Sequence, residues 1–277
     1  MSDADAEIFD AHCHWHDARL IPHAEQIERD LQTAKLRYTV VNGTHPGDWD
    51  AVAALAEQDE RVIPAFGLHP WKVNDAPADW LEKLQSMLDR FPNAVIGEVG
   101  LDRWIEGHDL PRQEDALKAQ LELAAAENRP ISLHCLKAWG QMLQLLETVP
   151  LPARGFHLHG YGGSPEMVRA FAELGGYFSF SAYVMHSRKV KHRDSLRVVP
   201  EDRLLIETDS PDMLPPEEWQ VFALPGKAAF AHALGGELLH HPANITAGYR
   251  AVAEVKEVDE LALRRQVEAN FMRYFLQ

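Results

Sequence analysis

Short apolar runs with the composition of β-strands alternate with helical segments along nearly the whole chain, and this repeat constrains the fold most. Strands are predicted over residues 7–14, 38–43, 62–67, 94–99, 130–135, 154–159, 177–181 and 203–208. Helices are predicted over residues 24–35, 49–58, 78–90, 113–128, 139–148, 167–174, 245–256 and 261–275. The repeat predicts an α/β fold, a closed (β/α)₈ TIM barrel, with residues 1–277 forming a single domain.

An open doubly wound sheet is the alternative architecture for such a repeat. That fold usually carries a Gly-rich phosphate-binding turn after its first strand. Here the corresponding turn is rich in histidine, with His12 and His14 at its start. No Gly/Ser-rich, Pro-rich or single-charge run separates two parts of the chain. The barrel is therefore the favoured prediction.

The formal net charge of −15 disfavours non-specific binding to duplex DNA or to an anionic membrane. A bound metal or a local basic cluster can still reverse the sign at one site. Cys13 and Cys135 are the only cysteines, which excludes a disulfide framework, and both are expected to face the helix layer as small apolar residues. The chain has no apolar signal segment and no run of membrane-spanning length, so we expect a cytoplasmic protein without membrane association.

Residues that can ligate metals recur at the predicted carboxyl ends of six strands, which is where barrel enzymes place their reactive groups. These residues are His12, His14, His69, Glu98, His134, His157, His159, Glu207 and Asp209. His12 and His14 are two residues apart, a spacing that points both imidazoles to one face of a strand. Each residue alone has an ordinary explanation as a core or surface side chain. Their joint recurrence at one end of a barrel favours a metal site.

At two of these strand ends, two residues are alternatives for one ligand position: His157 or His159, and Glu207 or Asp209. His159 and Asp209 lie nearer the mouth of the barrel than His157 and Glu207, so we expect the first two to bind metal and His157 to be a deeper hydrogen-bonding group. Glu98 lies in an apolar strand, where an unpaired carboxylate is costly, and this favours a functional role.

Several imidazoles and two carboxylates are more than one tetrahedral ion needs, which predicts two divalent metal ions with Glu98 bridging them. Coordination lowers the pKa of a bound water from ~16 to about 7. Asp209 could then accept the proton of this water, which makes Glu98 and Asp209 the predicted catalytic residues. Imidazole-rich ligation suits zinc, manganese or nickel better than magnesium.

The order of these motifs resembles the TatD family of metal-dependent hydrolases and deoxyribonucleases, a branch of the amidohydrolase-like TIM barrels. The motifs lie at residues 10–14, 67–70, 97–102, 133–135, 159–164, 207–211 and 270–275. The resemblance implies a two-metal barrel that cleaves phosphodiester bonds, often as a DNase. It assigns His12, His14, Glu98, His134, His159 and Asp209 to metal.

Two segments depart from the family pattern. After His134 the family commonly carries an Arg and an acidic residue, whereas residues 135–138 here read Cys-Leu-Lys-Ala. The family's basic segment is replaced by acidic and apolar residues over 212–241. Both changes fall where a substrate phosphate would be bound. They leave open a small-molecule amide, lactone or phosphoester hydrolase of the same two-metal mechanism.

A basic stretch over residues 186–193 follows the seventh strand, where barrels frequently bind phosphate. Its alternative interpretation is a solvated loop and helix face. We expect Arg188 and Lys191 from this stretch, together with His69 and Asp102, to contact substrate. The expected substrate is DNA or a short or single-stranded oligonucleotide, with a small ester or amide as the alternative.

Overall fold

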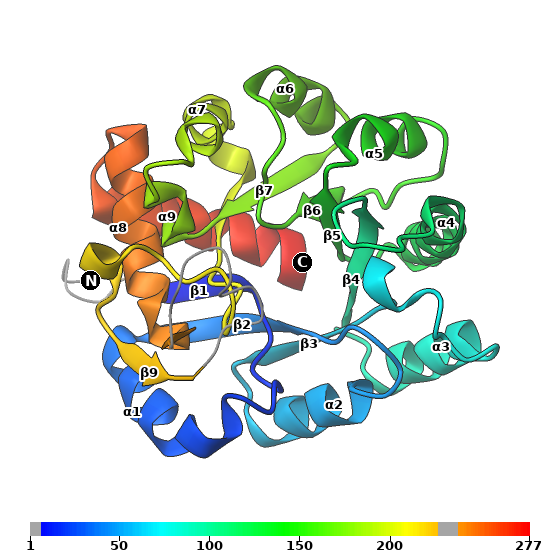
Figure 1. Ribbon diagram of the computed structural model, residues 1–277, viewed down its shortest axis with the longest axis horizontal. Helices are drawn as coiled ribbons and strands as arrows, with labels where there is room; N and C mark the ends of the chain where they lie inside the picture. The colour runs from blue at the N-terminus through cyan, green and yellow to red at the C-terminus, as the bar shows by residue number, and fades with distance from the viewer. Residues whose placement is uncertain (1–6, 227–237) are drawn as a thin grey trace.

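The computed structural model describes residues 7–226 and 238–277, and eight parallel strands form a ring with helices on its outside (Figure 1). Each strand pairs with the next one in the chain, in the order β1 to β8. The strands are β1 (Ile8–Cys13), β2 (Leu36–Asn42), β3 (Val62–Phe66), β4 (Val95–Asp102), β5 (Ile131–Leu136), β6 (Phe156–Leu158), β7 (Gly176–Phe180) and β8 (Leu204–Ile206). The predicted barrel is confirmed.

The helices of the outer layer follow the strands in turn. They are α1 (Ala24–Ala34), α2 (Trp49–Gln58), α3 (Trp80–Arg90), α4 (Leu110–Glu127), α5 (Trp139–Leu146), α6 (Pro165–Glu173), α7 (Val190–Val198), α8 (Ile245–Lys256) and α9 (Glu260–Phe271). The last predicted helix is divided, because α9 ends at Phe271 and a π-helical turn follows over Met272–Leu276.

One α-helix and two strands of the described residues were not predicted from the sequence. Helix α7 begins within the basic stretch and buries only Ser195 and Leu196, so its sequence lacks an apolar stripe. Strands β9 (Ala223–Pro225) and β10 (Leu238–His240) form a short antiparallel pair. Three residues are too few to show the alternation that identifies a strand.

The ring closes where the segment after β8 meets the end of β1. The amide of Asp209 donates to the carbonyl oxygen of His12 (2.9 Å), and the amide of His14 donates to that of Ser210 (2.8 Å). The pairing of β1 with β2 also shifts register between Asp10 and Cys13. Bulges of this kind redirect side chains near active sites. Closure and bulge together bring the His12 segment and the Asp209 segment to the same end of the barrel.

The amino-terminal end of the barrel interior is filled by apolar side chains and plugged by the carboxyl terminus of the chain. The strand residues of this cluster are Phe9, Ala11, Val40, Ile63, Ala65, Val95, Tyr177 and Leu205. Phe271, Tyr274 and Phe275 pack against them. The Tyr274 hydroxyl accepts from the amide of Ile131 (2.9 Å) and donates to its carbonyl oxygen (2.7 Å). With this end sealed, the opposite end remains for a functional site.

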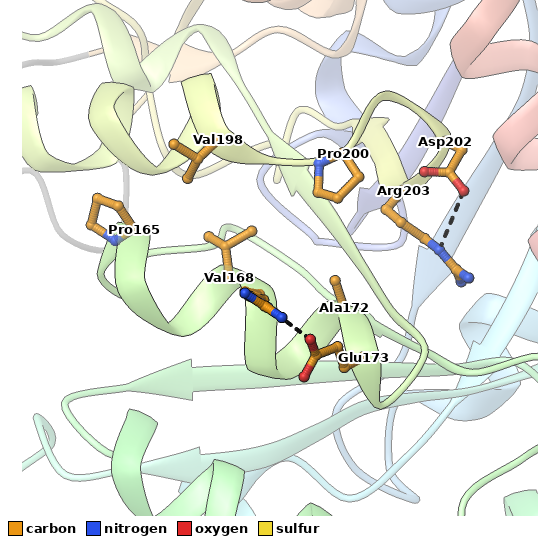
Figure 2. Close-up of a pocket in the computed structure, with 9 residues that line it drawn as sticks. Pro165, Val168, Ala172, Glu173, Val198, Pro200, Asp202 and Arg203 are labelled. Atoms are coloured by element: carbon orange, nitrogen blue, oxygen red, sulfur yellow. Dashed lines mark hydrogen bonds and ion pairs between the residues drawn. The ribbon is translucent and has the colours of Figure 1, made fainter.

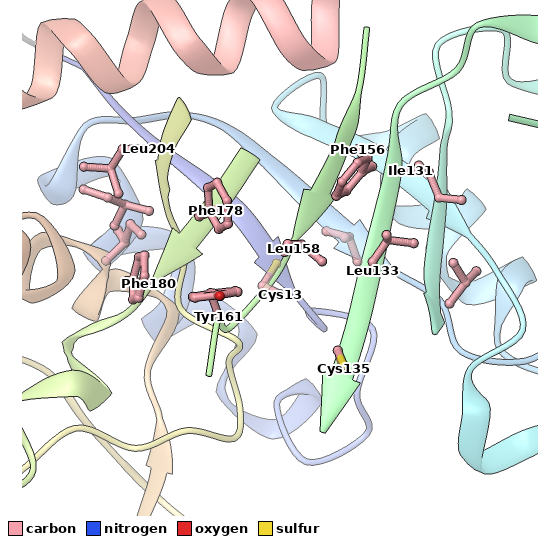
Figure 3. Packing of buried hydrophobic residues seen from close by; sticks show 14 of the residues in the cluster. Cys13, Ile131, Leu133, Cys135, Phe156, Leu158, Tyr161, Phe178, Phe180 and Leu204 are labelled. Carbon is pink, nitrogen blue, oxygen red and sulfur yellow. The ribbon is translucent and has the colours of Figure 1, made fainter. Parts of the chain in front are cut away.

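A larger apolar cluster lies between the barrel and the helices, and it includes both cysteines (Figure 3). Cys13 and Cys135 are buried free thiols, and burial raises the pKa of each thiol. Their predicted apolar role is therefore confirmed. Within the described ranges, every helix is too short or too polar to cross a membrane.

A hollow of about 450 Å³ lies on the outside of the barrel, between α6 and the region from α7 to β8 (Figure 2). Its lining residues are Pro165, Val168, Arg169, Ala172, Glu173, Val198, Pro200, Asp202 and Arg203. None of them belongs to the predicted site. The candidate catalytic groups lie instead at the mouth of the barrel.

Candidate metal centre

The six residues expected to bind metal converge at the carboxyl ends of the strands, where they and His69 form three overlapping groups of donor atoms. Sorted by the Glu98 oxygen that they face, the donors divide into two groups. In the first group, Nε2 of His12 lies 3.7 Å from Oδ1 of Asp209, and Nε2 of His14 lies 3.4 Å from the same oxygen. Oε2 of Glu98 lies 3.4 Å from both imidazole nitrogens. The donors of His12, His14 and Asp209 thus lie close enough together to hold one metal ion, and Glu98 adjoins both imidazoles.

The second group is built around the other oxygen of the same glutamate. Oε1 of Glu98 lies 2.8 Å from Nδ1 of His134 and 2.8 Å from Nε2 of His159. The two imidazole nitrogens are 3.3 Å apart. Glu98 therefore presents one carboxylate oxygen to each group, which is the geometry expected of a bridging ligand.

Glu98 is almost completely buried, yet it is surrounded by imidazoles that favour its charged form. Burial raises its pKa, but the surrounding histidines, His159 and His69 foremost among them, together outweigh burial and hold the pKa of Glu98 well below its usual value. Gly100 in the same strand allows the close approach of β5, because a Cβ atom there would lie 1.9 Å from the carbonyl oxygen of His134.

The hydrogen bonds of two histidines fix which ring nitrogen faces the centre. Nδ1 of His14 donates to the carbonyl oxygen of Asn42 (2.7 Å), which leaves Nε2 as the nitrogen that could ligate a metal. Nε2 of His134 lies 2.8 Å from Oδ2 of Asp102, which leaves Nδ1 as the nitrogen that could ligate a metal. In both cases the nitrogen that can bind a metal is the one that points at Glu98.

Asp102 is fully buried, and its oxygens accept hydrogen bonds from protein donors. Besides His134, they accept from the indole nitrogen of Trp71 (2.8 Å) and from the amides of Trp104 (2.6 Å) and Ile105 (3.1 Å). Although burial raises its pKa, these hydrogen bonds hold the pKa of Asp102 at about 2. The arrangement favours orientation of His134 over the direct substrate contact predicted for Asp102.

His69 differs from the other histidines of the centre. Its Nδ1 accepts from the amide of Trp71 (3.1 Å), so its Nε2 carries the proton and points at Oε1 of Glu98, 3.2 Å away. Although His69 lies within reach of the second group, this tautomer makes it a hydrogen-bond donor. A substrate contact therefore remains the prediction for His69.

The donor set fits divalent cations. Among the described residues, the buried Nε2 of His12 makes no hydrogen bond, although it lies within 4 Å of two carboxylates. Burial lowers the pKa of His12 well below its usual value, which keeps this imidazole neutral and able to ligate. Asp209 adopts a left-handed backbone conformation (φ 55°), which is uncommon for a residue other than glycine but is tolerated by Asp better than by most.

The remaining predicted substrate residues lie in the segment between β7 and α7 and at the start of α7. Arg188 and Lys191 are exposed, in the loop before α7 and in its first turn. The same turn approaches the loop after β6, since a Cβ atom at Gly162 would lie 3.2 Å from Nε2 of His192. In the acidic segment, Asp212 pairs with Arg19 (2.9 Å), and residues 227–237 of that segment lie outside the described residues.

Sequence reasoning missed an aromatic pair and a polar layer. The rings of Trp71 and Trp104 have centroids 6.4 Å apart at the mouth, and Trp104 is 46% exposed. Beneath the centre, Ser132 and Ser179 join His157 in buried hydrogen bonds. Ser132 stands two residues before His134, the spacing that shares one face of a strand, and this signal could have identified it.

Comparisons with known proteins agree with this geometry. A family model described as TatD related DNase matches residues 9–276. The chain is 32% identical over 211 residues to the uncharacterized metal-dependent hydrolase YjjV of Escherichia coli, covering 74% of this chain and 80% of YjjV. It is 31% identical over 197 residues to the 3′-5′ ssDNA/RNA exonuclease TatD of Pantoea ananatis, covering 69% of this chain and 74% of that protein.

Solved structures show the same fold. The crystal structure of Escherichia coli YjjV superposes with a TM-score of 0.86 at 25% identity, covering 98% of each chain. A TatD family hydrolase from Entamoeba histolytica superposes with a TM-score of 0.84 at 16% identity, covering 98% of this chain and 99% of the other.

Proposed function

The chain belongs to the family of TatD-related DNases, which are metal-dependent hydrolases, and from this premise we propose that it hydrolyses phosphodiester bonds in short or single-stranded DNA. One observation carries the proposal. Glu98 presents one oxygen to His12 and His14 and the other to His134 and His159, so two donor groups lie side by side. Paired cation sites of this kind suit displacement at phosphorus.

We propose two divalent ions per chain, held by His12, His14, Glu98 and Asp209 on one side and by Glu98, His134 and His159 on the other. The candidates are zinc, manganese, nickel and magnesium, and the imidazole-rich ligands favour the first three. Bound ions of this type supply an activated water at neutral pH and polarise a phosphoryl oxygen.

The protein's own groups complete the reaction. The carboxylate of Asp209 is 14% exposed, so one of its oxygens is available to accept a proton from the attacking water. The Nε2 proton of His69 points at Oε1 of Glu98, so we propose that His69 lies beside the bound phosphate at the edge of the centre. Burial of the ligands keeps the centre largely free of competing water, which strengthens these interactions.

The mouth of the barrel offers two features that suit a single strand. The Trp71 ring lies 6.2 Å from the ring of His134, and Trp104 extends this surface outward, which suits stacking of an unpaired base. Arg188 and Lys191 add positive charge in a protein of net charge −15, and they are the candidates for contact with the nucleic-acid backbone.

Cleavage of a labelled single-stranded oligonucleotide by protein loaded in turn with each candidate ion tests the proposal. We expect chelation to abolish cleavage, and Arg188→Ala or Lys191→Ala to raise KM more at low salt than at high salt, because salt screens contacts between cations and phosphates. An enzyme that leaves oligonucleotides intact with every ion, but hydrolyses a lactone, amide or phosphate monoester, would replace the nuclease by a small-molecule hydrolase.

A further inference from the structure

Lys189 differs from the other cations of the basic stretch, because it is partly buried and no carboxylate of the described residues pairs with it. Arg188 and Lys191, its neighbours in the sequence, are exposed to solvent. Arg193 donates hydrogen bonds to two backbone carbonyl oxygens, at 2.6 and 2.9 Å. A partly buried ammonium group without a counter-ion is costly, and this favours an anionic ligand for Lys189.

The two groups that Lys189 contacts are both uncharged. Its Nζ lies 4.6 Å from the centroid of the Tyr183 ring and 3.5 Å from Nε2 of His192. Burial, together with the nearby charges of Lys189 and Arg193, lowers the pKa of His192 to about 4, so this imidazole is neutral at neutral pH and can accept a hydrogen bond. An aromatic face and an imidazole acceptor both favour a charged ammonium group. These contacts therefore hold the cation in place without neutralising it.

Helix α7 is attached to the loop that follows the predicted ligand His159. A Cβ atom at Gly162 would lie 3.2 Å from Nε2 of His192, so the imidazole packs against the backbone of this loop. In the same loop, the carbonyl oxygen of Gly163 accepts a hydrogen bond from Oγ of Ser195 (2.7 Å). The partner of Lys189 is therefore held beside the segment that leads out of the second donor group.

The segment before α7 is attached to the other side of the mouth. Nε2 of His186 donates to the carbonyl oxygen of Leu214 (2.9 Å), in the segment that follows Asp209. The ring of His186 also lies 4.9 Å from the ring of Tyr183, on which Lys189 rests. Lys189 thus belongs to a part of the mouth that is attached to segments leading from both donor groups.

We propose that Lys189 binds a phosphate of the nucleic-acid strand other than the one that is cleaved. Lys189 contacts Tyr183 and His192 rather than a residue of the two donor groups, which assigns it to a neighbouring phosphate. The inference rests on the proposed function and adds to it a preoriented cation. Arg188 and Lys191 are exposed, so their side chains lose more conformational freedom when they bind.

The test measures the Kd of the zinc-loaded, full-length protein for a fluorescent single-stranded oligonucleotide with cleavage-resistant phosphorothioate linkages, by anisotropy at several salt concentrations. We expect Lys189→Met to weaken binding about tenfold or more at low salt, as loss of a hydrogen bond to a charged group does. The slope of log Kd against log salt concentration should fall by about 0.7, which corresponds to one phosphate contact on a single strand. Lys118→Met is the matched control, because Lys118 is a partly buried lysine of α4 in the outer layer of helices, and it should change neither quantity.

A second series of oligonucleotides locates the phosphate that Lys189 contacts. Each carries one neutral methylphosphonate, placed at successive positions along the strand. We expect one position at which this change weakens binding by the wild type and by Lys118→Met but not by Lys189→Met, the coupling that two groups in contact show. A purely structural role of Lys189 would weaken binding alike at every position and leave the salt slope unchanged.

A salt slope of Lys189→Met equal to that of the wild type, or the same response of both proteins at every methylphosphonate position, would overturn the role of Lys189 and leave the nuclease proposal intact. Should Lys189→Met fail to fold, Lys189→Gln, which keeps a polar end group, is measured in the same way. Cleavage of an unmodified oligonucleotide is assayed separately. A wild-type protein that shows the expected coupling but cleaves no oligonucleotide would remove the nuclease alone, so the two failures are distinguishable.

Discussion

Replacing Glu98 with glutamine tests the bridging arrangement at the atom on which both donor groups depend. The substitution keeps the size of the side chain but turns one carboxylate oxygen into an amide nitrogen, which cannot ligate a cation. That nitrogen must face either the His12 and His14 side, now 3.4 Å from Oε2, or the His134 and His159 side, now 2.8 Å from Oε1. One group therefore loses a ligand whichever way the amide turns.

We expect Glu98→Gln to lower the metal content from two ions per chain to one and to reduce kcat by about a thousandfold. This loss corresponds to about 4 kcal/mol of transition-state stabilisation, the upper range seen when one preorganised electrostatic partner is removed. Metal content is measured by mass spectrometry of the dialysed protein, and kcat by oligonucleotide cleavage. Glu122→Gln, which replaces an exposed residue of α4, controls for the change in charge. Two retained ions with a kcat within tenfold of the wild type would refute the bridging role.

Three further predictions concern the surroundings of the centre. Asp102→Asn should weaken zinc binding by about tenfold, because His134 loses its charged acceptor, and chelator competition measures this. Trp104→Ala should raise KM for a single-stranded oligonucleotide roughly tenfold or more with kcat unchanged, through loss of base stacking, as steady-state kinetics would show. Burial raises the pKa of Glu207 to about 8 from its usual 4.5, so in metal-free protein the folded state keeps a proton that the unfolded state releases. The protonated Glu207 therefore contributes to the free energy of unfolding in full below pH 4.5, and this contribution falls by about 1.4 kcal/mol per pH unit as the pH rises toward 8. Chemical denaturation at a series of pH values measures this fall, which Glu207→Gln should remove.

The repeat of strands and helices was sufficient to predict the barrel, because period and order are properties of the sequence itself. It did not reveal α7, whose basic residues carry no apolar stripe, or the division of the last helix at Phe271. Strand parity correctly placed Cys13 and Cys135 in the apolar layer outside the barrel.

The candidate site was predictable in its residues but not in its hydrogen bonding. The strand ends supply the donors, and the structure brings both Glu98 and Asp209 within 4 Å of His12. Which nitrogen of His134 faces inward depends on Asp102, 32 residues away, and such a partner follows only from three-dimensional closure. The assignment of these donors as metal ligands stays a prediction.

The side chains inside this barrel form three levels along its axis. Apolar side chains and the aromatic plug fill the amino-terminal end, hydrogen-bonded polar groups form the level above, and the donor groups open at the mouth. Buried polar groups cost stability unless they are fully paired, so a continuous chain of hydrogen bonds is the arrangement that such a level requires.

The most direct test of the metal centre is anomalous diffraction from crystals of the zinc- or manganese-loaded protein. We expect two anomalous peaks at the mouth of the barrel, one among His12, His14 and Asp209 and one beside His134 and His159, with the carboxylate of Glu98 between them. Loaded crystals with no peak at Glu98, or with peaks only elsewhere on the molecule, would contradict this expectation.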